Sequence, residues 1–162
     1  MFGLLKDIQV TAKAGAVIQR PCDDVFNFVG TDFFKNYPRW SPEVLDLKSL
    51  TEGPVKLGTL CRQVRVDQGN RSESTFKVTA FQPGRRICFE GVSNPYRCDY
   101  VLEPANPTSA SRITFTFELL RLELYMKPFE KLVRLAVQDG TERTVRNIKQ
   151  LIENEIAEPA AP

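Results

Sequence analysis

The chain has 162 residues, of which 42% are hydrophobic and 26% are charged, and its formal net charge is +2. This composition is typical of one globular domain, which we place at residues 1–156, followed by a disordered tail at residues 157–162. The nearly balanced charge and the lack of a Lys or Arg stripe argue against nucleic-acid binding.

Histidine is absent from the whole sequence. The chain therefore contains no Ser-His-Asp or Cys-His catalytic centre and no His-ligated zinc or iron. We expect no metal, no cofactor and no dedicated catalytic residue. Any catalysis would depend on carboxylates, Tyr, Lys, Arg, Cys or ordered water.

The sequence shows no targeting or membrane-spanning segment. Residues 1–7 are too few and too soon charged for a signal peptide, and no apolar run approaches the ~20 residues that span a bilayer. We therefore expect a cytoplasmic protein. Cys22, Cys61, Cys88 and Cys98 lack metal-site spacing, but Cys88 and Cys98 flank a turn, which leaves a cross-strand disulfide open.

The first predicted strand covers residues 9–19, and alternate positions form its inward face. Three alanines on this face either leave room above the strand or allow a helix to pack closely against it. The inward residues are Val10, Ala12, Ala14, Ala16 and Ile18.

Two short helices follow this strand. The first begins at Pro21, where a missing N–H costs least, and Asp23 and Asp24 suit its positive end. The second covers residues 32–36 and is expected to stop before Pro38. Trp40 either anchors this corner against the sheet or stacks on a ligand.

The middle of the chain predicts six further strands with turns at residues 68–70, 83–84 and 94–95. Such closely spaced hairpins favour an antiparallel sheet. The predicted strands are 44–50, 57–66, 72–81, 86–92, 96–103 and 111–120.

Helical spacing returns from residue 126 to residue 156. Gly140 interrupts the inward stripe, which indicates either a kink capped by Asp139 or a space cleared for a ligand. The other residues of the stripe are Phe129, Leu132, Val133, Ala136, Val145, Ile148, Leu151, Ile152 and Ile156.

Several short motifs, in order, resemble the START-like superfamily and its polyketide cyclase/dehydrase group. They are residues 20–29 (RPCDDVFNFV), 36–42 (NYPRWSP), 57–59 (LGT), 77–86 (KVTAFQPGRR) and the terminal helix. The resemblance implies an α+β helix-grip fold, in which a seven-stranded antiparallel sheet wraps around a long C-terminal helix and encloses a hydrophobic cavity. It implies no shared catalytic residue.

Strand parity suggests which side chains line this cavity, and charged residues on the opposite parity form a solvated outer face. Arg62 is expected to point inward, where it either binds a ligand carboxylate or reaches the rim. Tyr96 and Tyr100 offer hydroxyl groups to a ligand. The candidate ligand-binding residues are Arg62, Phe76, Phe89, Tyr96, Tyr100, Phe115, Phe117, Phe129, Val133, Ala136 and Gly140.

These observations favour a protein that binds a small apolar or aromatic molecule such as a lipid, a quinone or a polyketide. Two alternatives remain: a cyclase, dehydratase or aromatase that uses Tyr, Arg and water, and an interaction or co-chaperone module with a collapsed pocket. The oligomeric state is open.

Overall fold

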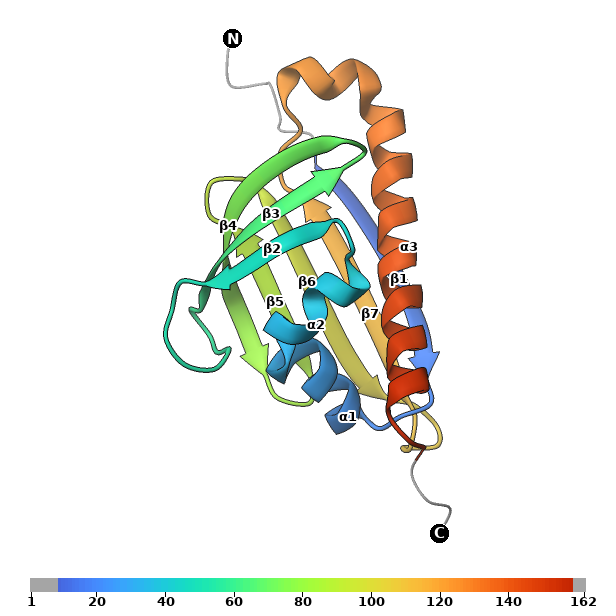
Figure 1. The fold of residues 1–162 in the computed structure, drawn as a ribbon. Coiled ribbons are helices and arrows are strands. Elements are labelled where there is room, and N and C mark those ends of the chain that lie inside the picture. Colours follow the sequence, from blue (N-terminus) through green and yellow to red (C-terminus); the bar gives the residue numbers. More distant parts are fainter. Residues whose placement is uncertain (1–8, 159–162) are drawn as a thin grey trace.

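The computed structural model describes residues 9–158 and shows one curved sheet gripping a long helix (Figure 1). All neighbouring strands are antiparallel, in the order β1-β7-β6-β5-β4-β3-β2. The predicted α+β helix-grip fold is confirmed. The strands are β1 (Val10–Ile18), β2 (Val44–Ser49), β3 (Leu60–Asp67), β4 (Asn70–Gln82), β5 (Arg86–Gly91), β6 (Tyr96–Pro104) and β7 (Ser111–Leu119).

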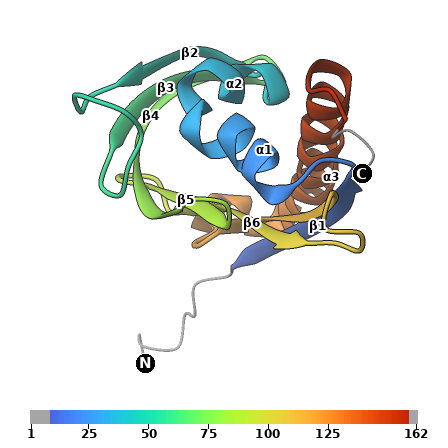
Figure 2. The same cartoon turned by 90° about the horizontal axis from the view of Figure 1, so that it is seen from below.

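Helices α1 (Cys22–Phe26) and α2 (Phe33–Trp40) connect β1 to β2 across the concave side of the sheet (Figure 2). A π-helical turn, η2 (Asn27–Thr31), joins them. The prediction that the second helix ends before Pro38 is wrong. Phe33, Tyr37 and Trp40 lie on one buried face of α2, and burying three aromatic side chains outweighs the backbone hydrogen bond that proline removes.

The C-terminal segment consists of a 3₁₀ turn, η3 (Leu124–Phe129), and the helix α3 (Glu130–Glu155). The helix runs without interruption through Gly140, so the predicted break capped by Asp139 does not form. Asp139 instead lies 3.8 Å from the Arg143 guanidinium, one turn further along α3. Of the predicted tail, residues 159–162 lie outside the described residues.

Helix α3 lies along β1, the edge strand of the sheet (Figure 1). Ala12 is fully buried, which supports the expectation that small side chains allow close packing of a helix. Side chains of α3 also bond the carbonyls of this edge, which would otherwise lack a strand partner. Arg134 donates to Gln9, Gln138 to Lys13 and Lys149 to Val17.

The far end of α3 is held by Arg20, whose side chain is almost completely buried. Its guanidinium donates to the carbonyl oxygens of Ile156 at 2.7 Å and Glu153 at 2.8 Å, and to that of Gln19 at 2.6 Å. Carbonyls at a helix C-terminus lack partners within the helix and carry partial negative charge. Arg20 therefore supplies hydrogen-bond donors to these carbonyls, and its positive charge offsets the partial negative charge at the C-terminus of α3.

The convex face of the sheet carries the charged residues predicted for it, and several of them form ion pairs. Arg97 lies between Glu90 at 3.2 Å and Glu118 at 3.0 Å, and Arg86 forms two hydrogen bonds with Asp99. These pairs are partly exposed, so they contribute little to stability. In residues 9–158, no helix is long and apolar enough to cross a membrane.

The four cysteines are free thiols. In the register of β5 and β6, Cys88 pairs with Asp99 and Cys98 pairs with Phe89. Neighbouring residues of a strand point to opposite faces, so Cys88 and Cys98 lie on different sides of the sheet. The disulfide left open by the sequence is therefore not formed.

We predict that Arg20→Met lowers the free energy of unfolding by about 2–4 kcal/mol, because buried carbonyls at the end of α3 lose charged donors. Arg112→Met is the matched control, since Arg112 is an exposed arginine on β7. Urea denaturation of both variants provides the measurement. Equal stability of the two variants would contradict the role assigned to Arg20.

Candidate ligand-binding site on the concave face

The concave face is divided into a packed half and an open half. Helix α2 fills the packed half with aromatic rings. Phe33 and Tyr37 lie 5.5 and 5.7 Å from Phe89 between ring centroids, and Trp40 lies 5.7 Å from Tyr100. The edge-to-face geometry of these contacts is favourable for aromatic pairs. This half of the concave face is therefore part of the packed hydrophobic core.

The open half is formed by the inward side chains at the other end of β6 and β7. Tyr96 pairs with Leu119 in the register, and Cys98 pairs with Phe117. The rings of Tyr96 and Phe117 stack with centroids 6.3 Å apart. Tyr96, Phe117 and Leu119 are all only half-buried. We use "open half" for these three residues, because their apolar surface is still accessible.

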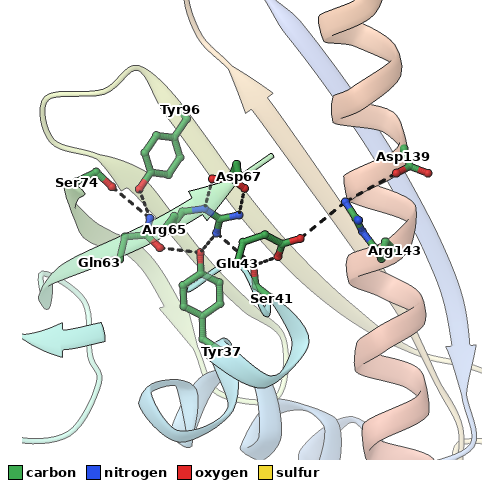
Figure 3. Close-up of polar contacts among 10 residues, drawn as sticks. All are labelled: Tyr37, Ser41, Glu43, Gln63, Arg65, Asp67, Ser74, Tyr96, Asp139 and Arg143. Atoms are coloured by element: carbon green, nitrogen blue, oxygen red, sulfur yellow. Dashed lines mark hydrogen bonds and ion pairs between the residues drawn. The ribbon is translucent and has the colours of Figure 1, made fainter. Parts of the chain in front are cut away.

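Gln63 on β3 forms a polar boundary beside the packed half (Figure 3). Its amide is fully buried and accepts a hydrogen bond from the Tyr37 hydroxyl at 3.1 Å. It donates to the Tyr96 hydroxyl at 3.1 Å and to the Ser74 hydroxyl at 3.3 Å. Because Tyr96 accepts this bond, its own proton remains available for Ser74 or for a ligand.

Arg65, two residues further along β3, is held rigidly at the same boundary (Figure 3). Its guanidinium forms a two-point contact with Asp67 at 3.1 and 3.0 Å. It also donates to the Tyr37 hydroxyl at 3.1 Å and to the Ser41 hydroxyl at 3.2 Å. These bonds use four of the five guanidinium donors, so one N–H of Nη2 has no partner within residues 9–158.

Burial controls the protonation of these groups. It raises the pKa of Tyr96 to about 12 and raises the pKa of Tyr37 still further. Burial alone would lower the pKa of Arg65, but contact with Tyr37 and Asp67 raises it overall. At neutral pH the boundary thus presents a charged guanidinium and two neutral hydroxyls.

The near side of α3 completes the surroundings of the open half. Asn147 donates to the Trp40 carbonyl at 3.0 Å, which shows the face of α3 that points toward α2. Gly140 and Val133 precede Asn147 by seven and fourteen positions, so they lie on the same face. On the adjacent face, Arg143 lies 3.9 Å from Glu43 at the start of β2.

Gly140 occupies a position with unused space. Apart from the helix backbone, the nearest described atom to a Cβ built there is Arg143 Nη2, at 3.7 Å. Packing therefore does not require glycine, although glycine costs about 1 kcal/mol relative to alanine inside a helix. This arrangement agrees with the hypothesis that Gly140 clears space for a ligand.

The candidate residues predicted from sequence separate into three groups. Phe76, Phe89, Tyr100 and Phe115 are buried in the aromatic core, whereas Tyr96 and Phe117 belong to the open half. Val133 and Gly140 are half-buried on α3. Phe129 at the end of η3 and Ala136 on α3 are exposed, so the prediction that they lie on the inward stripe is wrong, as it is for Leu132. The part of the candidate residues in ligand binding stays a prediction.

The prediction that Arg62 points inward is wrong. Its side chain is 53% exposed and pairs with Glu73 at 2.6 Å. The register of β3 and β4 places Cys61 opposite the buried Phe76, so Cys61, Gln63 and Arg65 share the concave face. The sequence did contain a signal for this. A two-residue turn pairs Asp67 with Asn70, and this register places Cys61 opposite Phe76. If Phe76 points inward, then Cys61 and every second residue after it, including Arg65, point inward too.

Two of the clefts on the described surface are shallow and lie away from the space between α3 and the concave face. One, of about 330 Å³, lies between the β5–β6 turn and Arg121. The other, of about 250 Å³, lies between α2 and the end of α3. Within residues 9–158, no three acidic or cysteine side chains gather in a way that could hold a metal ion.

The grip of a curved antiparallel sheet on α3, with a polar boundary above an apolar concave face, defines a START-like domain. Residues 8–153 match the family described as "Polyketide cyclase / dehydrase and lipid transport". The chain belongs to this family. No curated protein matches the sequence.

Solved structures with the same fold share little sequence with this chain. The ZhuI aromatase/cyclase from Streptomyces sp. R1128 has 13% identity and a TM-score of 0.76, covering 93% of this chain and 97% of its own. Norcoclaurine synthase from Thalictrum flavum has 13% identity and a TM-score of 0.70, with coverage of 95% and 99%. TTHA0849 from Thermus thermophilus has 17% identity and a TM-score of 0.71, with coverage of 91% and 99%.

We predict that Gly140→Ala raises the free energy of unfolding of the ligand-free protein by up to about 1 kcal/mol, because the helix gains alanine propensity and the new methyl group meets no close neighbour. Chemical denaturation measures the difference. Thr144→Ala, one turn along α3, controls for a general effect of alanine on the helix. A lower free energy of unfolding in Gly140→Ala would show that the position has no room for the added methyl group.

Proposed function

We propose that the protein binds a small apolar or aromatic molecule on the open half of the concave face. The apolar part of the ligand lies against Tyr96, Phe117 and Leu119. An acceptor group of the ligand, such as a carbonyl oxygen, accepts hydrogen bonds from Arg65 and Tyr96. Lipids, quinones and polyketide-like molecules have this combination of an apolar body and a carbonyl group.

The observation that carries this proposal is the unused Nη2 N–H of Arg65, beside an aromatic pair that is still accessible. A guanidinium held by Asp67, Tyr37 and Ser41 loses little conformational entropy when it binds a ligand. The unused space at Gly140 supports the same location. The family description includes lipid transport, and one similar structure is that of an aromatase/cyclase. The family and this similar structure both agree with an apolar or aromatic ligand.

The proposal includes a cytoplasmic location and a single domain over residues 1–156. Four free thiols support a reducing compartment, since disulfides form mainly in oxidising ones.

We predict that Arg65→Gln weakens the binding of anthraquinone about tenfold or more, because a charged hydrogen bond to a carbonyl oxygen is lost. Binding of anthracene, which has the same ring skeleton without the carbonyls, should not change. Arg62→Gln is the matched control, because Arg62 lies on the opposite face of the same strand. Isothermal titration calorimetry measures both ligands against each variant.

Tyr96→Phe provides a second test with less risk to folding, and it should also weaken anthraquinone more than anthracene. Thermal shift with palmitate, a polyprenyl quinone and both ring compounds extends the panel. The proposal is overturned if no compound stabilises the wild-type protein, or if Arg65→Gln and Arg62→Gln affect binding equally.

A cyclase or dehydratase activity is the second candidate, and the neutral hydroxyl of Tyr96 beside the Arg65 guanidinium favours it. Such donors polarise a carbonyl and stabilise the enolate oxygen that forms in a cyclisation. The chain holds no histidine to remove the proton, so ordered water or a carboxylate would take that role.

For this second candidate, we predict that the protein converts a poly-β-ketone thioester of pantetheine to an aromatic product, and that Tyr96→Phe lowers the rate about 100-fold. Absorbance and mass spectrometry follow the product, and Arg62→Gln is again the control. An unchanged rate in Tyr96→Phe, or no product above the uncatalysed reaction, would leave binding alone as the function.

A further inference from the structure

An exposed apolar surface covers η3 and the first turns of α3. Five large side chains form it, and the structure leaves each of them between 52% and 74% exposed. We call this set the apolar face. Its members are Leu124, Tyr125, Phe129, Leu132 and Leu135.

The same side of the helix becomes polar further along α3. Seven positions after Leu132 and Leu135, which corresponds to about two turns, the chain places Asp139 and Glu142. This side of α3 is therefore charged from Asp139 onward, as expected for a surface helix, and carries large apolar side chains only in the first two turns. Exposed apolar surface of this extent usually marks a site of association.

Two lysines border the apolar face. Arg121 lies near Glu123 and Arg134 pairs with Glu130, whereas Lys127 and Lys131 form no ion pair within residues 9–158. Residues 121–135 contain four basic and two acidic side chains, so this segment has an excess of two positive charges. Leucine and aromatic residues flanked by lysines are typical of helices that lie in a membrane interface.

We propose that η3 and the first turns of α3 dock on an anionic phospholipid surface. The apolar face enters the boundary between headgroups and acyl chains, and Lys127 and Lys131 pair with lipid phosphates. A self-associating interface is less favourable, because it would bring the unpaired lysines of two copies together. Phe129, the last residue of η3, belongs to this face and directly precedes the part of α3 that carries Val133 and Gly140, so docking would bring the candidate ligand site close to the lipid.

Co-sedimentation of the full chain with lipid vesicles tests this inference. We expect the wild-type protein to bind vesicles of equal parts phosphatidylcholine and phosphatidylglycerol, and to bind phosphatidylcholine alone more weakly. Lys127→Gln with Lys131→Gln should lower the partition coefficient for anionic vesicles about tenfold or more. The same double variant should not change binding to phosphatidylcholine.

Leu132→Gln with Leu135→Gln should lower binding to both vesicle types about tenfold or more, because apolar area is lost from the interface. The matched control is Leu45→Gln with Leu57→Gln, since these two leucines are 65% and 66% exposed elsewhere on the molecule. All four leucines are exposed, so the variants should fold, and circular dichroism checks this.

Four outcomes would overturn the inference. The wild-type protein does not bind either vesicle type, or the control pair lowers binding as much as the test pair. In the third, vesicle binding is absent and light scattering shows a dimer that Leu132→Gln with Leu135→Gln makes monomeric, which assigns the surface to a second copy. In the fourth, vesicle binding appears only after removal of residues 1–8, which assigns the surface to that segment. The readout is independent of the ligand titrations, so it can fail while the proposed function holds.

Discussion

The packing of α2 against the concave face is the interaction on which the rest of the structure depends. Phe33, Tyr37 and Trp40 place three aromatic rings between the sheet and α3, in contact with Phe89 and Tyr100. These rings fill the middle of the concave face between α2 and strands β5 and β6, while α3 packs directly on β1 at the edge of the sheet. They leave only the part of the concave face beside Tyr96 and Phe117 free of α2, which is where we propose that a ligand binds.

The edge of this aromatic core is where polar side chains can be accommodated in an otherwise apolar interior. Tyr37 contributes its ring to the core and its hydroxyl to Gln63 and Arg65. A buried polar group is costly unless it is hydrogen-bonded. This network satisfies Gln63, while one Arg65 N–H has no partner in the part of the chain that the structure describes. The same tyrosine thus stabilises the fold and orients the groups proposed to meet a ligand.

The architecture was predictable from the sequence because each element carries its own local signal. Turn residues and alternating hydrophobicity located all seven strands, and helical spacing located α3. Helix α2 was predicted too short, since tertiary burial of Trp40 outweighs the local effect of Pro38. At the site, strand parity suggested the wrong face of β3, with Arg62 pointing inward. Which side chains of β3 point inward depends on the register with β4, where Cys61 pairs with the buried Phe76. The residue pattern of β3 alone does not contain this register.

The sequence by itself determined the class of fold, the absence of histidine chemistry and the apolar character of the concave face, because these follow from composition and local periodicity. The tertiary structure alone decided that aromatic rings fill half of the grip, that Arg65 rather than Arg62 points inward, and that the first turns of α3 expose apolar side chains among residues 9–158. Each of these depends on which residues distant in the chain come together, and packing and strand register, rather than local propensity, set those contacts.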